Sequence, residues 1–152
     1  MNKTLSVSAI KNGTVIDHVP AGQALRIVHM LGLIEKKRRI TLGLNLSSHR
    51  MKLKDLIKIE NHFLTHDEAN KTSVFAPEVT INIIKNFEVE EKIITELPEN
   101  VTDVFLCPNP VCITHVEPIE SFFMIEGQGA EVQLKCKFCE KAFDRNRVKV
   151  KI

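Results

Sequence analysis

The chain has 152 residues, 43% hydrophobic and 26% charged, which is ordinary for a globular protein of one or two small domains. No apolar run approaches 18 residues, so we expect no membrane span, and the first ten residues lack the features of a secretory signal. The net charge of +2 divides into +3 for residues 1–96 and −1 for 97–152, which disfavours a C-terminal region that grips nucleic acid.

The first part of the chain predicts strands separated by two helices. Apolar residues at helical spacing follow Pro20 and predict a helix that stops near Gly32. The second helix is predicted to start after Thr65, because Thr65 and Glu68 have the spacing of a capping box, and to end before Pro77. Alternating residues predict the strands, at 5–10, 15–16, 40–46, 55–60, 79–83 and 87–94.

This order of elements predicts the α+β fold class. We expect a two-layer, ferredoxin-like N-terminal domain over residues 1–97, with two helices on one face of a mostly antiparallel sheet. Pro98 marks the expected boundary. Residues 98–152 are predicted to form a small all-β domain with short strands at 103–106, 119–125, 131–136 and 147–152 and a hairpin turn at 127–129.

All four cysteines lie in this second domain. Cys107 and Cys112 are spaced C-x4-C, Cys136 and Cys139 are spaced C-x2-C, and 23 residues separate the pairs. Two short-spaced pairs suit a tetrahedral site of four thiolates, which is closed to water and substrate and therefore predicts one structural Zn²⁺. A domain of this size also needs such a metal, because its apolar core is too small to stabilise it alone.

Two other uses of four cysteines stay open at this point. Two disulfides are disfavoured, because a chain without an export signal is expected in the reducing cytoplasm. A rubredoxin-like iron site would have the same number of ligands and would indicate an electron carrier. A zinc-ribbon protein that binds nucleic acid is the remaining alternative, and the acidic balance of the second domain argues against it.

The sequence lacks the motifs of the common catalytic sites, including phosphate-binding loops, zinc-protease helices and the nucleophile elbow, so no enzyme activity is expected. One polar group in the first domain suggests a small anionic ligand. Asp17 and His18 precede the first helix, while Lys58 and Lys92 lie on strands. The alternative for Lys58 is a solvated side chain on the exposed face of an edge strand.

The chain resembles the family of aspartate carbamoyltransferase regulatory chains over essentially all of its length. The segments that carry the resemblance are GTVIDH (13–18), RITLGLNL (39–46), KDLIKIEN (54–61), CPN (107–109), CI (112–113) and LKCKFCEK (134–141).

The resemblance implies a non-catalytic, cytoplasmic protein of pyrimidine biosynthesis. Its first domain would bind CTP and UTP as inhibitors and ATP as activator, and its zinc domain would dock on the catalytic chain. It would form a regulatory homodimer, and three such dimers would join two catalytic trimers. No nucleic acid or membrane partner is implied.

The resemblance also implies an effector site, position by position. Asp17 and Lys58 match residues at the ribose and base, and His18 and Lys92 match residues at the triphosphate. The implied wall around the base consists of Val7, Ala9, Ile10, Ile84, Phe87 and Val89.

Overall fold

The computed structural model describes residues 9–151 and divides the chain into two compact units, with the boundary along the chain between Thr95 and Glu96. The predicted site residue Val7 lies outside the described residues, and so does most of the predicted strand at 5–10. Among the described residues, no helix is long and apolar enough to cross a membrane.

The N-terminal unit is built on a five-stranded antiparallel sheet in the order β2-β3-β1-β4-β5. The strands and helices follow one another as β1, α1, β2, β3, α2, β4, β5, which is the split βαβ arrangement of ferredoxin-like folds with β5 added at one edge. The elements are β1 Gly13–Pro20, α1 Ala24–Met30, β2 Ile40–Ser48, β3 Lys52–Glu60, α2 His66–Thr72, β4 Thr80–Lys85 and β5 Glu88–Ile93.

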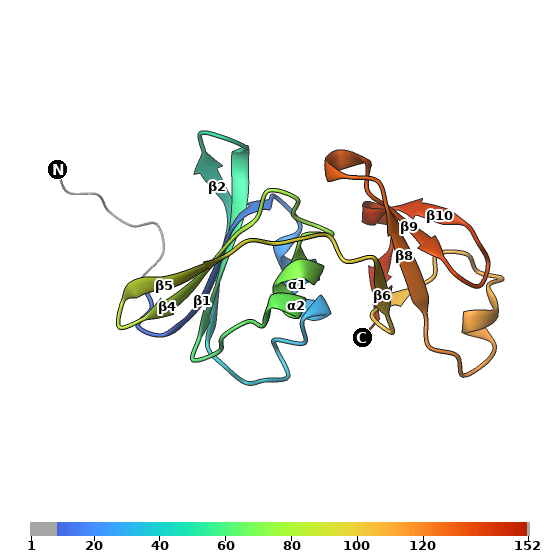
Figure 1. The fold of residues 1–152 in the computed structure, drawn as a ribbon, viewed down its shortest axis with the longest axis horizontal. Helices are drawn as coiled ribbons and strands as arrows, with labels where there is room; N and C mark the ends of the chain where they lie inside the picture. Colours follow the sequence, from blue (N-terminus) through green and yellow to red (C-terminus); the bar gives the residue numbers. More distant parts are fainter. Residues whose placement is uncertain (1–8, 152) are drawn as a thin grey trace. The chain divides into compact units, whose positions relative to one another are not determined.

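The two faces of this sheet differ in chemistry because side chains alternate along each strand. One cross-strand row consists of Ile57, Ile16, Ile81 and Ile93, all buried, and both helices lie on that face (Figure 1). The neighbouring row points the other way and carries Thr41, Lys58, Val15, Asn82 and Lys92. The sheet therefore separates an apolar core from a face with several polar side chains.

The two helices begin for different reasons. The predicted capping box at α2 is confirmed, since the Thr65 hydroxyl accepts from the Glu68 amide and the Glu68 carboxylate accepts from the Thr65 amide. The predicted start of the first helix near Pro20 is wrong, because Pro20 ends β1 and the helix begins at Ala24. The predicted short strand at 15–16 is likewise only part of β1, the central strand of the sheet.

The C-terminal unit is all-β apart from three turns of 3₁₀ helix, which confirms the predicted class of this region. Its main sheet has the order β10-β9-β8-β6, and a separate pair joins β7 and β11. These strands are β6 Asn100–Thr102, β7 Phe105–Leu106, β8 Phe122–Glu126, β9 Gln133–Cys136, β10 Ala142–Asp144 and β11 Lys149–Val150. The predicted turn at 127–129 lies between β8 and β9, which pair as a hairpin.

The core of this second unit is small. Phe105 and Phe123 meet edge to face with ring centroids 6.0 Å apart. Leu134 and Phe143 are buried as well, and so are Cys107, Cys112 and Cys136. A core of this size leaves much of the stability to the cysteine site.

Candidate functional site

The four cysteines come together from two loops of the C-terminal unit. Cys107 directly follows β7, Cys112 directly precedes a 3₁₀ turn at Ile113–His115, Cys136 ends β9, and Cys139 lies in the turn before β10. All four sulfur atoms lie within 4.8 Å of one another. The short contacts run between the two pairs, with Sγ–Sγ distances of 3.7 Å from Cys107 to Cys139 and 3.8 Å from Cys112 to Cys136.

These distances identify the kind of site. Disulfide sulfurs are about 2.05 Å apart, so the four thiols are free and the disulfide alternative is excluded. Four sulfurs at about 2.3 Å from one ion in tetrahedral geometry would lie about 3.8 Å from each other. The cluster therefore has the dimensions of a closed tetrahedral zinc centre, in agreement with the cofactor predicted from the cysteine spacing.

The electrostatics of the thiols also fit a cation. Burial raises the pKa of Cys107 and Cys136, because a thiolate is poorly solvated in the interior. At Cys139 burial acts in the same direction, but hydrogen bonds from the Lys141 backbone and the Asn109 side chain lower the pKa to about 7. A divalent ion would stabilise all four sulfurs as thiolates and offset their burial.

His115 lies outside the sulfur cluster, as expected from a shell already filled by four cysteines. Its Nε2 is 2.8 Å from the carbonyl oxygen of Cys107. A carbonyl oxygen can only accept, so Nε2 carries the proton and donates. His115 thus positions the loop that presents Cys107.

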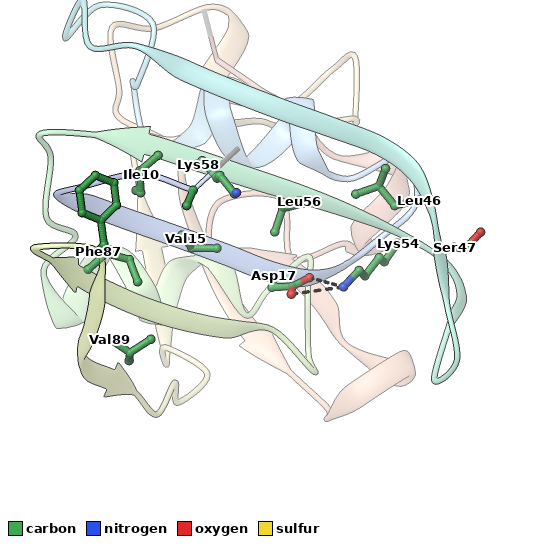
Figure 2. A pocket seen from close by; sticks show the side chains of 12 residues that line it. Ile10, Val15, Asp17, Leu46, Ser47, Lys54, Leu56, Lys58, Phe87 and Val89 are labelled. Carbon is green, nitrogen blue, oxygen red and sulfur yellow. Dashed lines mark hydrogen bonds and ion pairs between the residues drawn. The ribbon is translucent and has the colours of Figure 1, made fainter. Parts of the chain in front are cut away.

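The N-terminal unit contains a cavity of about 550 Å³ on the sheet face away from the helices (Figure 2). Seven of the ten predicted effector residues line it, namely Ala9, Ile10, Asp17, Lys58, Ile84, Phe87 and Val89. Five further residues that were not predicted line it too, namely Val15, Leu46, Ser47, Lys54 and Leu56. The chain before β1 and all five strands therefore contribute to one cavity.

The charges in this cavity come from two lysines and one aspartate. The Lys54 ammonium lies 2.9 Å and 3.2 Å from the two carboxylate oxygens of Asp17 (Figure 2). Lys58 is only 8% exposed, and burial lowers its pKa, while the nearby Asp17 acts in the opposite direction. The cavity thus holds one more cation than anion and suits an anionic ligand.

Two of the other predicted effector residues, His18 and Lys92, do not line this cavity. His18 follows Asp17 at a bulge in β1, with a φ of 58°, and its Nδ1 lies 2.9 Å from the Thr80 hydroxyl. Lys92 is exposed on β5, in the same cross-strand row as Lys58 and Val15. Val7 is outside the described residues.

A signal in the sequence could have found Lys54 and Leu56. Both lie on β3 at two-residue spacing from Lys58, and residues at this spacing share one face of a strand. Once Lys58 is placed in a site, Leu56 and Lys54 follow as neighbours. Leu46 and Ser47 had no such signal, because they reach the cavity only after an irregularity in the pairing of β2 with β3 between Gly43 and Leu46.

The two units match two family descriptions. Residues 5–96 match the allosteric domain of the aspartate carbamoyltransferase regulatory chain, and residues 99–149 match its metal-binding domain. The chain is 51% identical over 144 residues to the aspartate carbamoyltransferase regulatory chain of Aeromonas salmonicida, covering 95% of this chain and 94% of that one.

This chain belongs to the family of aspartate carbamoyltransferase regulatory chains. The proteins of the same name from Tolumonas auensis and Chromobacterium violaceum are 49% identical over 146 residues and 47% identical over 148 residues. They cover 96% and 97% of this chain, and the matches span 95% and 97% of the two relatives. Members of the aspartate carbamoyltransferase regulatory family are distinct from the catalytic chain, so the prediction of a non-enzymatic protein is confirmed.

The two matches also divide the sites between the domains. The allosteric domain of the regulatory chain contains the cavity, and the metal-binding domain contains all four cysteines. The four clustered cysteine sulfurs and the match to the metal-binding domain point to the same kind of site. The regulatory chain therefore carries a structural zinc centre. As a regulatory chain it has the catalytic chain of aspartate carbamoyltransferase as its partner.

Proposed function

We propose that the cavity of the allosteric domain binds the nucleotides CTP, UTP and ATP, and that the zinc domain passes the effect to the catalytic chain. CTP and UTP would inhibit and ATP would activate. The observation that supports this proposal most is that seven residues implied by the family resemblance line a single cavity of about 550 Å³ with two ammonium groups and one carboxylate.

The chemistry of the side chains supports a nucleotide. The Asp17 carboxylate accepts from ribose hydroxyls, and the Lys58 ammonium donates to base and ribose oxygens. His18 contacts Thr80 of β4 and Lys92 pairs with Asn82 of the same strand. Their imidazole and ammonium groups suit phosphate oxygens of a ligand that extends beyond the cavity. The apolar residues Ile10, Ile84, Phe87 and Val89 provide a surface for the base.

One orphaned polar atom supports a ligand on this face. The Oδ1 of Asn82 is buried and has no hydrogen-bond partner among the described residues. Asn82 lies between Val15 and Lys92 in the cross-strand row that carries Lys58. A buried oxygen without a donor is unfavourable, and a nucleotide with hydroxyl or amino donors would satisfy it.

The zinc domain is proposed to dock on the catalytic chain. Val111 and Val116 are 81% and 78% exposed on the stretch that follows Cys107, and Ile113 between them is also exposed. Large apolar side chains that gather at the surface are typical of protein interfaces. Zinc would hold this stretch in place, because Cys107 and Cys112 bound its first part.

The proposed assembly follows the family. Regulatory chains would form homodimers, and three dimers would join two catalytic trimers in the cytoplasm. Nucleotides would shift the holoenzyme between two states only through a difference in their affinity for those states.

The test combines effector binding with assembly. The chain is mixed with the catalytic trimer, the complex is isolated, and its activity is measured with and without CTP. We expect a stable complex that CTP inhibits, and calorimetry should give one effector site per regulatory chain. A complex whose activity is the same with and without each of the three nucleotides would contradict the proposal.

The variant Lys92→Ala tests the phosphate contact. We expect CTP to bind about ten-fold or more weakly, because a hydrogen bond to a charged group contributes about 1.5–3 kcal/mol. Lys71→Ala is the control, since Lys71 lies on α2 and pairs with Asp67 at 3.2 Å. Equal CTP affinity in both variants would remove Lys92 from the site.

A further inference from the structure

The zinc-binding unit contains a second cavity, of about 420 Å³, beside the cysteine loop. It is lined by Leu106, Cys107, Pro108, Pro110, His115, Arg147 and Lys149. The lining residues include two permanent cations and no carboxylate. Residues 97–152 hold eight acidic against seven basic side chains, so the positive charge of this cavity stands out in an acidic unit.

Among the described residues, neither Arg147 nor Lys149 forms an ion pair, although carboxylates are plentiful in the unit. The neighbouring Lys151 shows the contrast, since its ammonium lies 2.6 Å from an Asp103 carboxylate oxygen. Lys149 pairs with Leu106 across β7 and β11 and so shares a face with the cavity wall. Both side chains are exposed, so the two cations are accessible to an anion that approaches the cavity.

The geometry around Arg147 leaves its hydrogen-bonding edge available. Its guanidinium carbon lies 5.5 Å from the centroid of the Phe143 ring, so the ring supports the cation from one side. A guanidinium in that position keeps its N–H groups for a planar anion, and a carboxylate fits this fork with two parallel hydrogen bonds. His115, which also lines the cavity, is held by its hydrogen bond to the Cys107 carbonyl.

The surroundings of the cavity are apolar and exposed. Leu106 forms part of its wall, and Val111 and Val116 directly follow the lining residues Pro110 and His115 in the chain. A charged pocket inside an exposed apolar patch is the arrangement of an interface hot spot, where neighbouring apolar contacts exclude water from a strong polar contact. A small soluble anion would gain nothing from the apolar rim.

We propose that this cavity receives an aspartate or glutamate side chain of the catalytic chain, held by Arg147 and Lys149. The inference rests on the proposed docking of the zinc domain and adds the chemistry of the contact. The buried ion pair would set the orientation of docking, and it would make assembly sensitive to salt.

The direct test is a zero-length carbodiimide cross-link in the isolated holoenzyme, because this reagent joins an amine only to a carboxylate in contact with it. Mass spectrometry is expected to find Lys149 joined to an acidic residue of the catalytic chain. Lys149→Arg keeps the charge and removes the amine, so it should assemble normally and give no such product. A holoenzyme without any cross-link from Lys149 to the catalytic chain would overturn the proposal.

The double variant Arg147→Gln/Lys149→Gln tests the contribution of the charges. It should keep its zinc and its affinity for CTP, assemble about ten-fold or more weakly, and lose part of the salt dependence of assembly. Lys135→Gln on β9 is the matched control and should assemble as wild type. Unchanged assembly of the double variant contradicts the inference but leaves docking intact, whereas a wild-type chain that never joins the trimer contradicts docking itself.

A small-anion site is the competing outcome. Inorganic phosphate would then bind the free chain, the double variant would lose that binding, and assembly would not change. This combination would also overturn the proposal.

Discussion

Phe87 occupies a backbone conformation that its side chain disfavours. Asn86 and Phe87 form the two-residue turn between β4 and β5 with φ values of 51° and 66°, the left-handed pair that usually selects Asn-Gly. The turn is held by the segment before β1. The Phe87 amide donates to the Lys11 carbonyl at 2.9 Å, and the Asn86 amide donates to Oδ1 of Asn12 at 3.1 Å. The Phe87 residue is 64% exposed and lines the cavity. The strained backbone therefore places the ring at the cavity and adds nothing to the buried core.

Phe87→Gly should therefore change stability and ligand affinity in opposite directions. Glycine removes about 1 kcal/mol of left-handed strain, so the midpoint of urea unfolding should rise, while loss of the ring should weaken CTP several-fold in calorimetry. Asn86→Gly is the control, because it leaves the ring in place and should leave the affinity unchanged. A Phe87→Gly chain that is less stable than wild type would show that the turn is not strained.

Lys58 also lowers the stability of the fold while it contributes to the cavity, and here the cause is its buried charge. Burial lowers its pKa below the usual value of a lysine, so at neutral pH the folded chain carries an ammonium that the unfolded chain solvates better. The unfolded state therefore binds more protons between the two pKa values, and the resulting loss of stability disappears as the pH rises toward 10.5.

Lys58→Met should accordingly raise the free energy of unfolding at neutral pH in the absence of nucleotide. The gain over wild type should shrink as the pH rises toward 10.5, because the folded wild-type chain releases the Lys58 proton before the unfolded chain does. CTP should bind the variant about ten-fold or more weakly. A gain that is constant with pH would show that charge burial is not its origin.

At the scale of elements, the start of α1 is controlled from β3. The Gln23 side chain at the N-cap makes no capping hydrogen bond. Asp55, which is 1% exposed, instead accepts from the amides of Gly22 at 2.9 Å and Ala24 at 3.2 Å through one oxygen. Its other oxygen accepts from the Asn45 amide at 3.0 Å, beside the irregular part of β2. One carboxylate thus fixes a helix end and the strand segment that carries Leu46 to the cavity.

Asp55→Asn should destabilise the N-terminal unit by about 2–3 kcal/mol, because one oxygen and an amide group cannot satisfy three buried N–H donors. Chemical denaturation measures the change. The exposed Asp67 of α2 provides the control Asp67→Asn, whose effect should stay within about 0.5 kcal/mol. If the two variants lose equal stability, Asp55 does not organise this region.

This contrast explains which elements the sequence could predict. The start of α2 was predictable because Thr65 and Glu68 are three residues apart and cap each other locally. The start of α1 was not, because its cap comes from Asp55, more than 30 residues away. The strand β10 was not predicted, since its three residues Ala142–Asp144 are too few for a periodic pattern.

At the scale of the whole molecule, the two sites differ in how far the sequence determined them. The zinc site was predictable because each pair of cysteines is local and the ligand chemistry is specific. The cavity draws on all five strands, and periodicity alone cannot place their side chains together. The family resemblance implied seven of its lining residues but not Lys54, whose pairing with Asp17 depends on the register of β1 and β3.

The two units should also respond differently to loss of the metal. Residues 96–151 bury few large side chains, so Cys136→Ser or a strong chelator should unfold them, while the sheet of residues 9–95 keeps its own core. Hydrogen exchange should show lost protection only beyond Thr95, CTP should still bind, and the chain should no longer join the catalytic trimer. Normal assembly by the metal-free variant would refute the structural role of zinc.

The strand β5 links the cavity to the timescale of regulation. Among the described strands it lies at the edge of the sheet, pairs with β4 alone, and buries only Ile93. It nevertheless brings Val89 to the cavity and Lys92 to the row that carries Lys58. Edge strands of this kind detach locally at a small fraction of the global unfolding free energy. Transient detachment of β5 would then let a bound effector leave the cavity. The dissociation rate of the effector would depend on how often β5 detaches, and less on the strength of any single contact.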